Sequence, residues 1–270
     1  MINEVIKMKA IWKGSISFGL VNIPIKVYKA TESRIISFNN LHKECGTPLV
    51  YKRWCPKCNK EVAYEDIEKG YKLTKEKYVI IKKEDLEKLK LKTTKAIEIQ
   101  EFVDASQIDP IFIEKSYYVV PEETGIKAYS LFVEALRVAN KVAIGKVVMR
   151  NKEYLVALRA YKKGIVMHIL HYLGEVKDIG ELSELKHLVT VKEEELRLAQ
   201  ALIAKLTEPE FDVSKFKDSY TEALMKLIKA KAEGKEIKIK EERIEEAKEL
   251  MEALKASVEK IKKKKKVKAK

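Results

Sequence analysis

The stretch VAIGKVVMRNKEYLVALRAYKKGIVMHILHYL, residues 142–173, is the clearest sign of the fold in this chain. It contains three apolar runs, which the polar segments 150–153 and 162–164 separate. Short apolar runs divided by turn residues are typical of consecutive antiparallel strands, so the stretch predicts a three-stranded meander. His168 and His171 fall on its third strand. Residues three apart on a strand point to opposite faces, so this pair predicts two separate histidines and no shared metal site.

The same β pattern extends over residues 9–191, which predicts a mostly antiparallel β core within an α+β protein. Further strands are expected at residues 15–18, 23–28, 35–39, 49–53, 78–81, 97–103 and 116–120. Two helices interrupt them, at residues 84–89 and 127–140. In the longer helix, Leu131, Ala135 and Val138 share one face.

After Val191 the apolar residues follow a helical period. Residues 192–234 are expected to form a helical arm of two helices. The first has capping-box spacing at Thr190 and Glu193 and ends near Pro209, and the second follows Ser214 and stops at Gly234. Residues 241–270 are expected to form an amphipathic helix, 241–261, and a lysine-rich tail. Both the arm and this last helix carry narrow apolar stripes, which favours burial against a partner, although packing on the chain's own core is the alternative.

The charge of the chain favours a polyanionic partner. The 270 residues contain 55 Lys and Arg against 41 Asp and Glu, a formal net charge of +14, and the last ten residues, IKKKKKVKAK, contain no acid. Such an excess is typical of proteins that bind nucleic acid or an anionic membrane surface, although a solvated Lys/Glu-rich surface without a partner is the alternative. No apolar run approaches the ~18 residues of a membrane span, so we expect a soluble cytoplasmic protein without a membrane partner.

The three cysteines of the chain lie close together in HKECGTPLVYKRWCPKCNKEV, residues 42–62. His42 and Cys45 form one pair with two intervening residues, and Cys55 and Cys58 form another. Such spacing lets two side chains of one turn reach adjacent corners of a tetrahedron, so the four residues predict a structural zinc knuckle at 42–58. The alternative is a set of free buried thiols with His42 elsewhere.

Catalytic motifs are missing from the sequence. We find no phosphate-binding G-x-x-x-x-G-K-[ST] loop, no Lys-x-Asp-Gly of a nucleotidyl-transferring ligase and no G-x-S-x-G elbow. The fragment that includes Pro209 and Asp212 has only a faint similarity to a nuclease site. The sequence therefore favours a binding protein over an enzyme.

Seven motifs occur in an order that resembles the prokaryotic Ku family, the DNA-end-binding proteins of bacterial and archaeal non-homologous end joining. They are KAIWKGSISFGLVNIPIK from Lys9, LHKEC and CPKC, QIDPIFIEKSYYVVPE, KAYSLFVEALR, ALRAYKKGIVMHILHY, and DSYTEALMKLIKAKAEGKEI. The resemblance covers residues 9–239, and the segment MEALKASVEKIKKKKK is similar to the helix and basic end of many members.

The resemblance implies a β-barrel core whose helical arms intertwine in a ring-shaped homodimer threaded by double-stranded DNA. It also implies nucleoid-associated, sequence-independent binding of DNA ends without catalysis, and recruitment of a multidomain ATP-dependent repair ligase. Phosphate neutralisation would give such binding a steep dependence on salt.

Basic residues near strand ends and turns are the candidates for DNA contact, and each can equally be a solvated surface charge. They are Lys13, Lys26, Lys52, Arg53, Arg150, Lys152, Arg159 and Lys162, together with Lys262, Lys263, Lys264, Lys265 and Lys266 of the tail. Tyr51 and Trp54 stand beside two of them and can either stack on a base or pack within the knuckle. One rival function is a zinc-ribbon factor that grips RNA or DNA with the knuckle, and a second is a nucleic-acid-processing enzyme.

Overall fold

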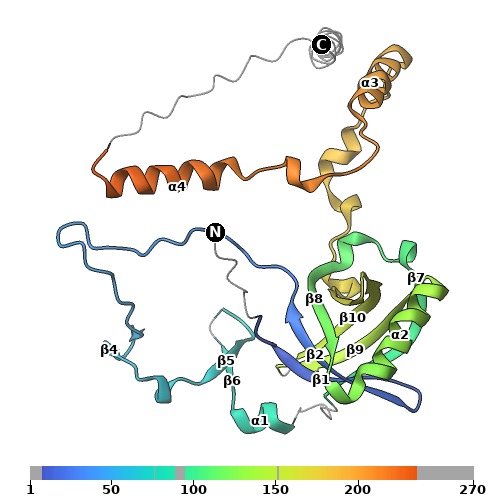
Figure 1. Ribbon diagram of the computed structural model, residues 1–270. Helices are drawn as coiled ribbons and strands as arrows, with labels where there is room; N and C mark the ends of the chain where they lie inside the picture. The colour runs from blue at the N-terminus through green and yellow to red at the C-terminus, as the bar shows by residue number, and fades with distance from the viewer. Residues whose placement is uncertain (1–7, 76, 89–94, 151, 236–270) are drawn as a thin grey trace. The chain divides into compact units, whose positions relative to one another are not determined.

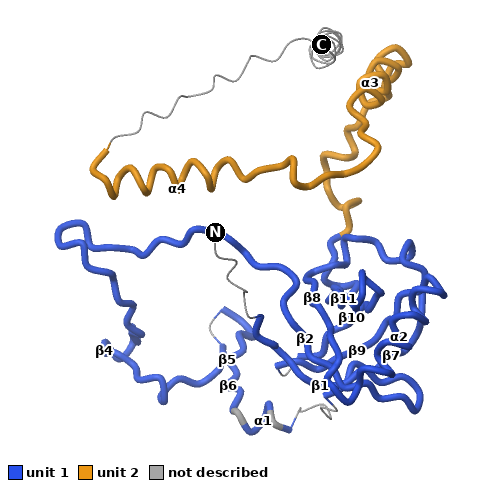
Figure 2. Tube along the Cα trace, in the orientation of Figure 1, with its two compact units in different colours: residues 1–177 blue, residues 178–270 orange. Residues whose placement is uncertain are grey.

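The computed structural model describes residues 8–75, 77–88, 95–150 and 152–235, and it divides the chain into two compact units, residues 1–177 and 178–270 (Figure 2). The boundary between the two units follows Lys177. Residues 178–191 therefore group with the helical unit, although the sequence pattern assigned them to the β core.

The first unit is built on a closed barrel of seven strands (Figure 1). The strands follow one another around the barrel in the order β1-β2-β8-β11-β10-β9-β7. Their bounds are β1 Trp12–Phe18, β2 Val21–Lys29, β7 Ala96–Asp104, β8 Ile113–Pro121, β9 Lys141–Met149, β10 Lys152–Tyr161 and β11 Gly164–Leu170. The meander is confirmed as β9, β10 and β11, which pair antiparallel. All other neighbours are also antiparallel except β1 and β7, which close the barrel in parallel, with Ser15 opposite Ala96.

Alternation along the strands places the core inside the barrel. In β2, Ile23, Ile25 and Val27 are fully buried, whereas Pro24 and Lys26 between them are only partly covered. In β10, Val156 and Leu158 are buried in the same interior cluster. Because burying an aliphatic side chain of this size contributes roughly 1.5–3 kcal/mol, this alternation fixes which face of each strand turns inward.

Helix α2, Ile126–Ala139, packs on the barrel with a face other than the one that Leu131, Ala135 and Val138 share. Tyr129, Phe132, Val133 and Leu136 are buried, while Leu131 is 72% exposed and Val138 is also exposed. The Tyr129 hydroxyl donates a hydrogen bond to the carbonyl of Val119 (2.6 Å) and accepts one from the amide of Ile165 (2.9 Å), which ties α2 to β8 and β11. The helix has two apolar faces, and the barrel covers the one with the larger aromatic side chains.

Two expected strands between β2 and β7 are wrong, because residues 35–39 and 49–53 form no ladder. Ile35 and Phe38 are exposed, and no neighbouring segment offers them a hydrogen-bonded edge. This part of the chain instead contains short elements, among which the strand at residues 78–81 is confirmed. They are β3 Trp54–Cys55, β4 Lys60–Glu61, β5 Lys69–Lys72, β6 Tyr78–Ile81 and α1 Lys83–Lys88.

The second unit contains α3, Glu193–Leu206, and α4, Ser219–Ala232. The expected capping box at Thr190 is wrong. Helix α3 begins at Glu193, so the residue before it is Lys192. The carboxylate that caps this end is therefore that of Glu195, which accepts a hydrogen bond from the amide of Lys192 (3.3 Å). Gly234, with φ of +70°, follows α4 as expected of a C-terminal stop.

The remaining segments of regular structure are single turns of 3₁₀ helix: Tyr64–Asp66, Ala105–Gln107, Pro110–Phe112, Glu123–Gly125, Leu173–Glu175, Ile179–Glu181, Ser183–His187 and Val213–Lys215. The helix and the tail expected over residues 241–270 lie outside the described residues. No helix in the described part of the chain is long and apolar enough to cross a membrane.

Candidate nucleic-acid interface

The outer face of five barrel strands, β1, β2, β8, β11 and β10, brings together basic residues that are far apart in the sequence. Lys13 on β1 lies opposite Lys26 on β2, and Tyr28 on β2 lies opposite Tyr118 on β8. The row continues through Val166 on β11 to Arg159 on β10. Because the alternate residues of these strands fill the barrel, these side chains lie on its outside.

Basic and aromatic side chains gather at the β10 end of this face. The rings of Tyr118 and Tyr161 stack with their centroids 6.4 Å apart. The Arg159 guanidinium lies over the Tyr161 ring at 5.3 Å and the Lys162 ammonium at 5.6 Å. We call Tyr118, Arg159, Tyr161 and Lys162 the Tyr161 cluster. Two cations over one ring form a positive surface that can accept phosphate groups.

A hydrogen bond holds the turn at the edge of the Tyr161 cluster. Lys162 has a left-handed backbone, with φ of 50°, between β10 and β11. Its carbonyl accepts a hydrogen bond from the Arg137 guanidinium of α2, which also pairs with Glu134. The helix therefore fixes the turn, which makes Arg137 a structural residue and leaves the Lys162 side chain toward solvent.

Ion pairing divides the predicted DNA-contacting residues into two groups. Lys26 pairs with Glu122 (3.9 Å), Lys52 with Glu61 (2.9 Å) and Lys152 with Glu175 (3.8 Å). The group that forms no ion pair with a carboxylate of the described residues is Lys13, Arg53, Arg150, Arg159 and Lys162. Unpaired cations keep their full attraction for phosphate, so this second group contains the stronger candidates.

The structure does not gather all the candidates on one element. Arg150 and Lys152 lie at the β9–β10 turn, the opposite end of β10 from the Tyr161 cluster. Lys52 and Arg53 belong to the segment between β2 and β7, where Arg53 lies over the Tyr64 ring at 5.1 Å. Tyr51 accepts a hydrogen bond from the Asn40 side chain (2.7 Å). Lys262 to Lys266 lie outside the described residues.

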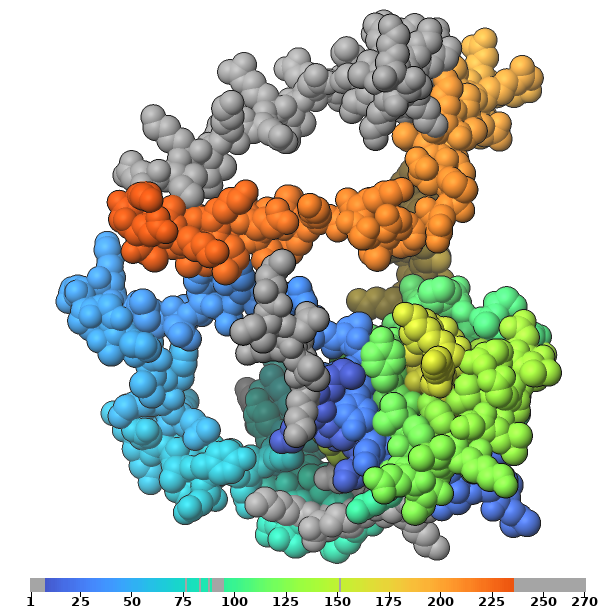
Figure 3. All heavy atoms as spheres, viewed as in Figure 1, coloured from blue at the N-terminus to red at the C-terminus, as the bar shows by residue number. Residues whose placement is uncertain are grey.

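The cysteine segment forms two ligand pairs. Nδ1 of His42 lies 3.2 Å from Sγ of Cys45, and the β3–β4 turn holds Cys55 and Cys58. Hydrogen bonds from Thr47 and His42 lower the pKa of the Cys45 thiol to about 7, and the amide and thiol of Cys58 lower the pKa of Cys55. Within the described residues, no three potential ligands form one cluster. Cysteine and histidine are zinc ligands, and the lowered thiol pKa values favour the thiolate form that binds zinc. The four residues lie as two separate pairs, each of which supplies two ligands, and we call each pair a half-site. Figure 3 shows the segment between β2 and β5 in blue to light blue as an extended run of chain, and residues 49–51 of this segment are exposed.

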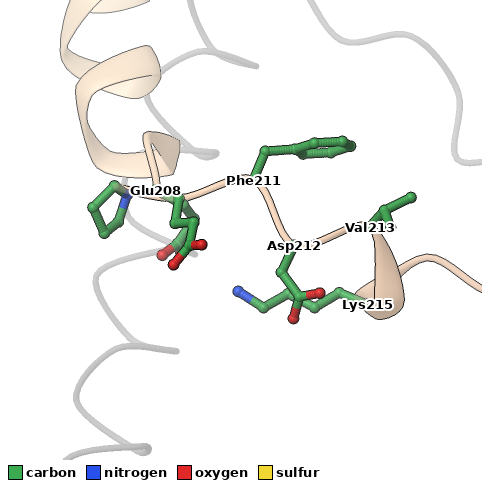
Figure 4. Close-up of a pocket in the computed structure, with 7 residues that line it drawn as sticks. Glu208, Phe211, Asp212, Val213 and Lys215 are labelled. Atoms are coloured by element: carbon green, nitrogen blue, oxygen red, sulfur yellow. The ribbon is translucent and has the colours of Figure 1, made fainter. Parts of the chain in front are cut away.

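An open pocket of 490 Å³ in the second unit contains Pro209 and Asp212, which belong to the fragment with a faint similarity to a nuclease site (Figure 4). The Asp212 carboxylate accepts hydrogen bonds from the amide (2.9 Å) and the hydroxyl (2.7 Å) of Ser214, and these bonds lower the pKa of Asp212. The carboxylate thus caps the short 3₁₀ turn that follows. Asp212 has a local structural role that accounts for its position.

A groove of 510 Å³ runs along α2 on the first unit. Its lining is apolar apart from Lys141 and comprises Phe18, Val21, Phe102, Ala128, Leu131, Phe132, Ala135, Leu136 and Ala139. The face of α2 that Leu131 and Ala135 share therefore forms one wall of an exposed apolar groove.

Comparison with known proteins identifies the barrel. Residues 17–198 match the family model of the Ku70/Ku80 beta-barrel domain. The chain belongs to the Ku family. The matched residues include the last two residues of β1, all other strands of the barrel and the first turns of α3. The recognition made from the sequence motifs is thus confirmed, and so is the α+β barrel fold.

Several proteins of the Ku family are similar over nearly the whole chain. The non-homologous end joining protein Ku of Archaeoglobus fulgidus is 48% identical over 255 residues, which cover 94% of this chain and 100% of that protein. The protein of the same name from Heliobacterium modesticaldum is 44% identical, with 94% and 93% covered. That of Bacillus subtilis is 41% identical, with 94% and 83% covered.

Sequence reasoning missed the aromatic half of the interface in this Ku-family barrel. Tyr118 and Tyr161 lie in the quoted motifs, but nothing in the sequence alone gives the register that stacks them. It also treated His168 as an isolated histidine, although the structure gives it two side-chain partners. One pattern in the sequence could have indicated these contacts. Side chains point alternately inward and outward along β10 and β11, which places Arg159, Tyr161 and His168 on the outer face.

Proposed function

We propose that this protein binds the ends of double-stranded DNA in non-homologous end joining, as a homodimeric ring without catalytic activity. The observation that carries the proposal is the Tyr161 cluster on a Ku beta-barrel, together with relatives that are named non-homologous end joining proteins. The surface offers two cations beside aromatic rings. Such a surface suits phosphate contacts and sequence-independent binding.

Exposed apolar surface supports the homodimer. On α3, Leu196, Ile203 and Leu206 are exposed, and on α4 Tyr220 and Met225 are exposed. The α2 groove adds a second apolar surface on the first unit. Amphipathic helices gain most of their stability by burying such a stripe, and a second copy of the chain presents complementary apolar surfaces. A ring formed by two copies would admit a DNA terminus but not a closed circle.

The same proposal includes two finer parts. His42, Cys45, Cys55 and Cys58 hold a structural zinc ion once the two half-sites approach each other, and the ion supplies a fixed tetrahedral crosslink. A loaded ring bridges and protects DNA ends and recruits a multidomain ATP-dependent repair ligase, with residues 241–261 as the proposed contact. Both parts rest on ligand spacing and on the resemblance of the sequence to the Ku family.

A gel-shift comparison of one duplex in three forms tests the proposal. The forms are open linear, sealed by hairpins at both ends, and closed circular, each at moderate salt with competitor DNA. We expect tight binding to the open linear form alone, and retention of the protein on DNA that is circularised after binding. Equal binding to all three forms would contradict a threaded ring and would favour the zinc-ribbon factor that grips nucleic acid through the knuckle.

A further inference from the structure

His168 on β11 makes a side-chain contact with each neighbouring strand. Its Nδ1 lies 2.8 Å from the Ser116 hydroxyl on β8. Its Nε2 lies 3.0 Å from Nε of Arg159 on β10, which is a hydrogen-bond donor in every protonation state of proteins. The row Ser116, His168 and Arg159 therefore crosses three strands of the outer face beside the Tyr161 cluster.

The direction of these bonds fixes the form of the imidazole. Because Arg159 donates, Nε2 of His168 must accept, so Nε2 carries no proton. The ring proton is then on Nδ1 and is donated to the Ser116 hydroxyl. A doubly protonated His168 has no acceptor for Arg159 and would repel it, so only the neutral Nδ1–H form fits the arrangement.

The surroundings of His168 keep it neutral. His168 and Arg159 form the polar edge of a pocket of 220 Å³ that is otherwise lined by apolar residues, among them Ile108 and Leu170. Burial first, and then the positive charge of Arg159, lower the pKa of His168. Arg159 is the charged group that faces it from β10, β8 contributes the neutral Ser116, and the loop before β8 contributes apolar side chains.

Two side chains hold the Arg159 guanidinium, but no carboxylate of the described residues neutralises its charge. Its Nε is bonded to His168 and its plane lies over Tyr161, while no carboxylate of the described chain forms an ion pair with it. The terminal nitrogens of a guanidinium form a planar fork that matches two phosphate oxygens. Lys162 lies over the same ring and adds positive charge beside the fork.

We propose that Arg159 binds a backbone phosphate of duplex DNA and that His168, itself held by Ser116, is the positioning residue that holds the Arg159 guanidinium for that contact. The inference rests on the proposed function, since it names the contact through which the barrel meets DNA. It assigns to His168 a role in binding that requires neither metal coordination nor proton transfer.

Binding of a linear blunt duplex, measured by fluorescence anisotropy over a range of KCl concentrations, tests the contact. Arg159→Ala should weaken binding about tenfold, the size of a lost hydrogen bond to a charged group, and should reduce the salt slope by about one for each contact. Lys115→Ala is the control. Lys115 precedes Ser116 on β8, so its side chain points to the opposite side of the strand from Ser116. It is also ion-paired with Glu114 (2.5 Å).

The role of His168 is tested by substitutions that keep or remove the acceptor. His168→Leu should weaken binding roughly two- to tenfold, because the guanidinium loses its fixed orientation, and should leave the salt slope unchanged because its charge remains. His168→Gln, which can present an oxygen to Nε of Arg159, should restore most of the affinity. In the Arg159→Ala background, His168→Leu should have no further effect.

The outcomes separate this inference from the proposed function. If the wild type binds open ends but Arg159→Ala binds equally well, the inference is wrong and the end-binding function stands. If the wild type does not bind duplex ends, both are wrong. If His168→Leu weakens binding equally in both backgrounds, its effect is not exerted through Arg159, and the positioning role is overturned.

A second measurement is made on the wild type and uses a variant only to assign the signal. Ring ¹⁵N NMR of the wild type, which has four histidines, should show one neutral histidine with its proton on Nδ1 at pH 7.5, absent from the His168→Gln spectrum. A His168 signal with the proton on Nε2 would contradict the arrangement, because that nitrogen could not accept from Arg159. Circular dichroism of each variant confirms that the barrel is retained.

Discussion

At the scale of single residues, two polar side chains join neighbouring elements of this barrel. Tyr129 satisfies a carbonyl of β8 and an amide of β11 with one hydroxyl, and its burial raises its pKa to about 12, so it stays neutral. His168 does the equivalent on the outside, between Ser116 and Arg159. Each contact depends on the register in which neighbouring strands pair. This register cannot be read from a single sequence.

The lowered pKa of His168 predicts how stability depends on pH. The unfolded chain binds a proton at this residue near pH 6.5, whereas the folded chain resists it to lower pH. Between these values the unfolded state holds more protons, so the free energy of unfolding should fall as pH drops below about 6.5. We expect the wild type to lose more thermal stability than His168→Gln between pH 7.5 and 5.5. Equal losses would show that His168 titrates normally.

At the scale of elements, the sequence predicted all seven strands of the barrel, including β7 and β8, whose partners are distant in the chain. The meander and the helices of the arm follow from periodicity alone. Residues 35–39 and 49–53 have a strand-like composition but no ladder, because a strand also needs an edge to pair with. Helix α2 shows the converse, since it has two apolar faces and only the barrel decides which one is buried.

The cysteine segment is the element that metal should reorganise most. Purified protein should contain about one zinc ion per chain, and Cys55→Ser combined with Cys58→Ser should remove it, because two ligands alone bind weakly. Cys45→Ser should lower the affinity for zinc with less effect. Metal analysis after dialysis measures the content. A fully folded wild type that contains no metal would contradict the zinc site.

The apolar stripe of α3 should control assembly. Ile203 is 65% exposed in the single chain, so Ile203→Glu would bury a charge if the stripe forms the dimer. We expect this variant to sediment as a monomer and to lose end-specific binding. Gln200→Glu, which adds the same charge to an exposed polar position of α3, should remain dimeric. A dimeric Ile203→Glu protein would place the interface elsewhere.

At the scale of the whole molecule, the positive net charge should determine the part of the DNA affinity that comes from general electrostatic attraction. Seven lysines occupy the last nine residues, 262–270. Deletion of these residues should make the salt dependence of duplex binding less steep, because fewer counterions are released, while the preference for open ends remains. An unchanged slope in an anisotropy titration would mean that the tail makes no contact with DNA.

The parallel contact between β1 and β7 has a consequence for the order in which the chain folds. The meander assembles from neighbouring segments, but Ser15 reaches Ala96 only after the whole segment after β2 has been spanned. Contacts between distant residues form late, since closing a loop costs entropy, by roughly 0.6 kcal/mol for each doubling of its length. We therefore expect an intermediate in which β1 and β7 are still unpaired edges. A metal ion that tethers residues 42–58 would shorten the effective loop, so its influence should be seen in the rate of refolding.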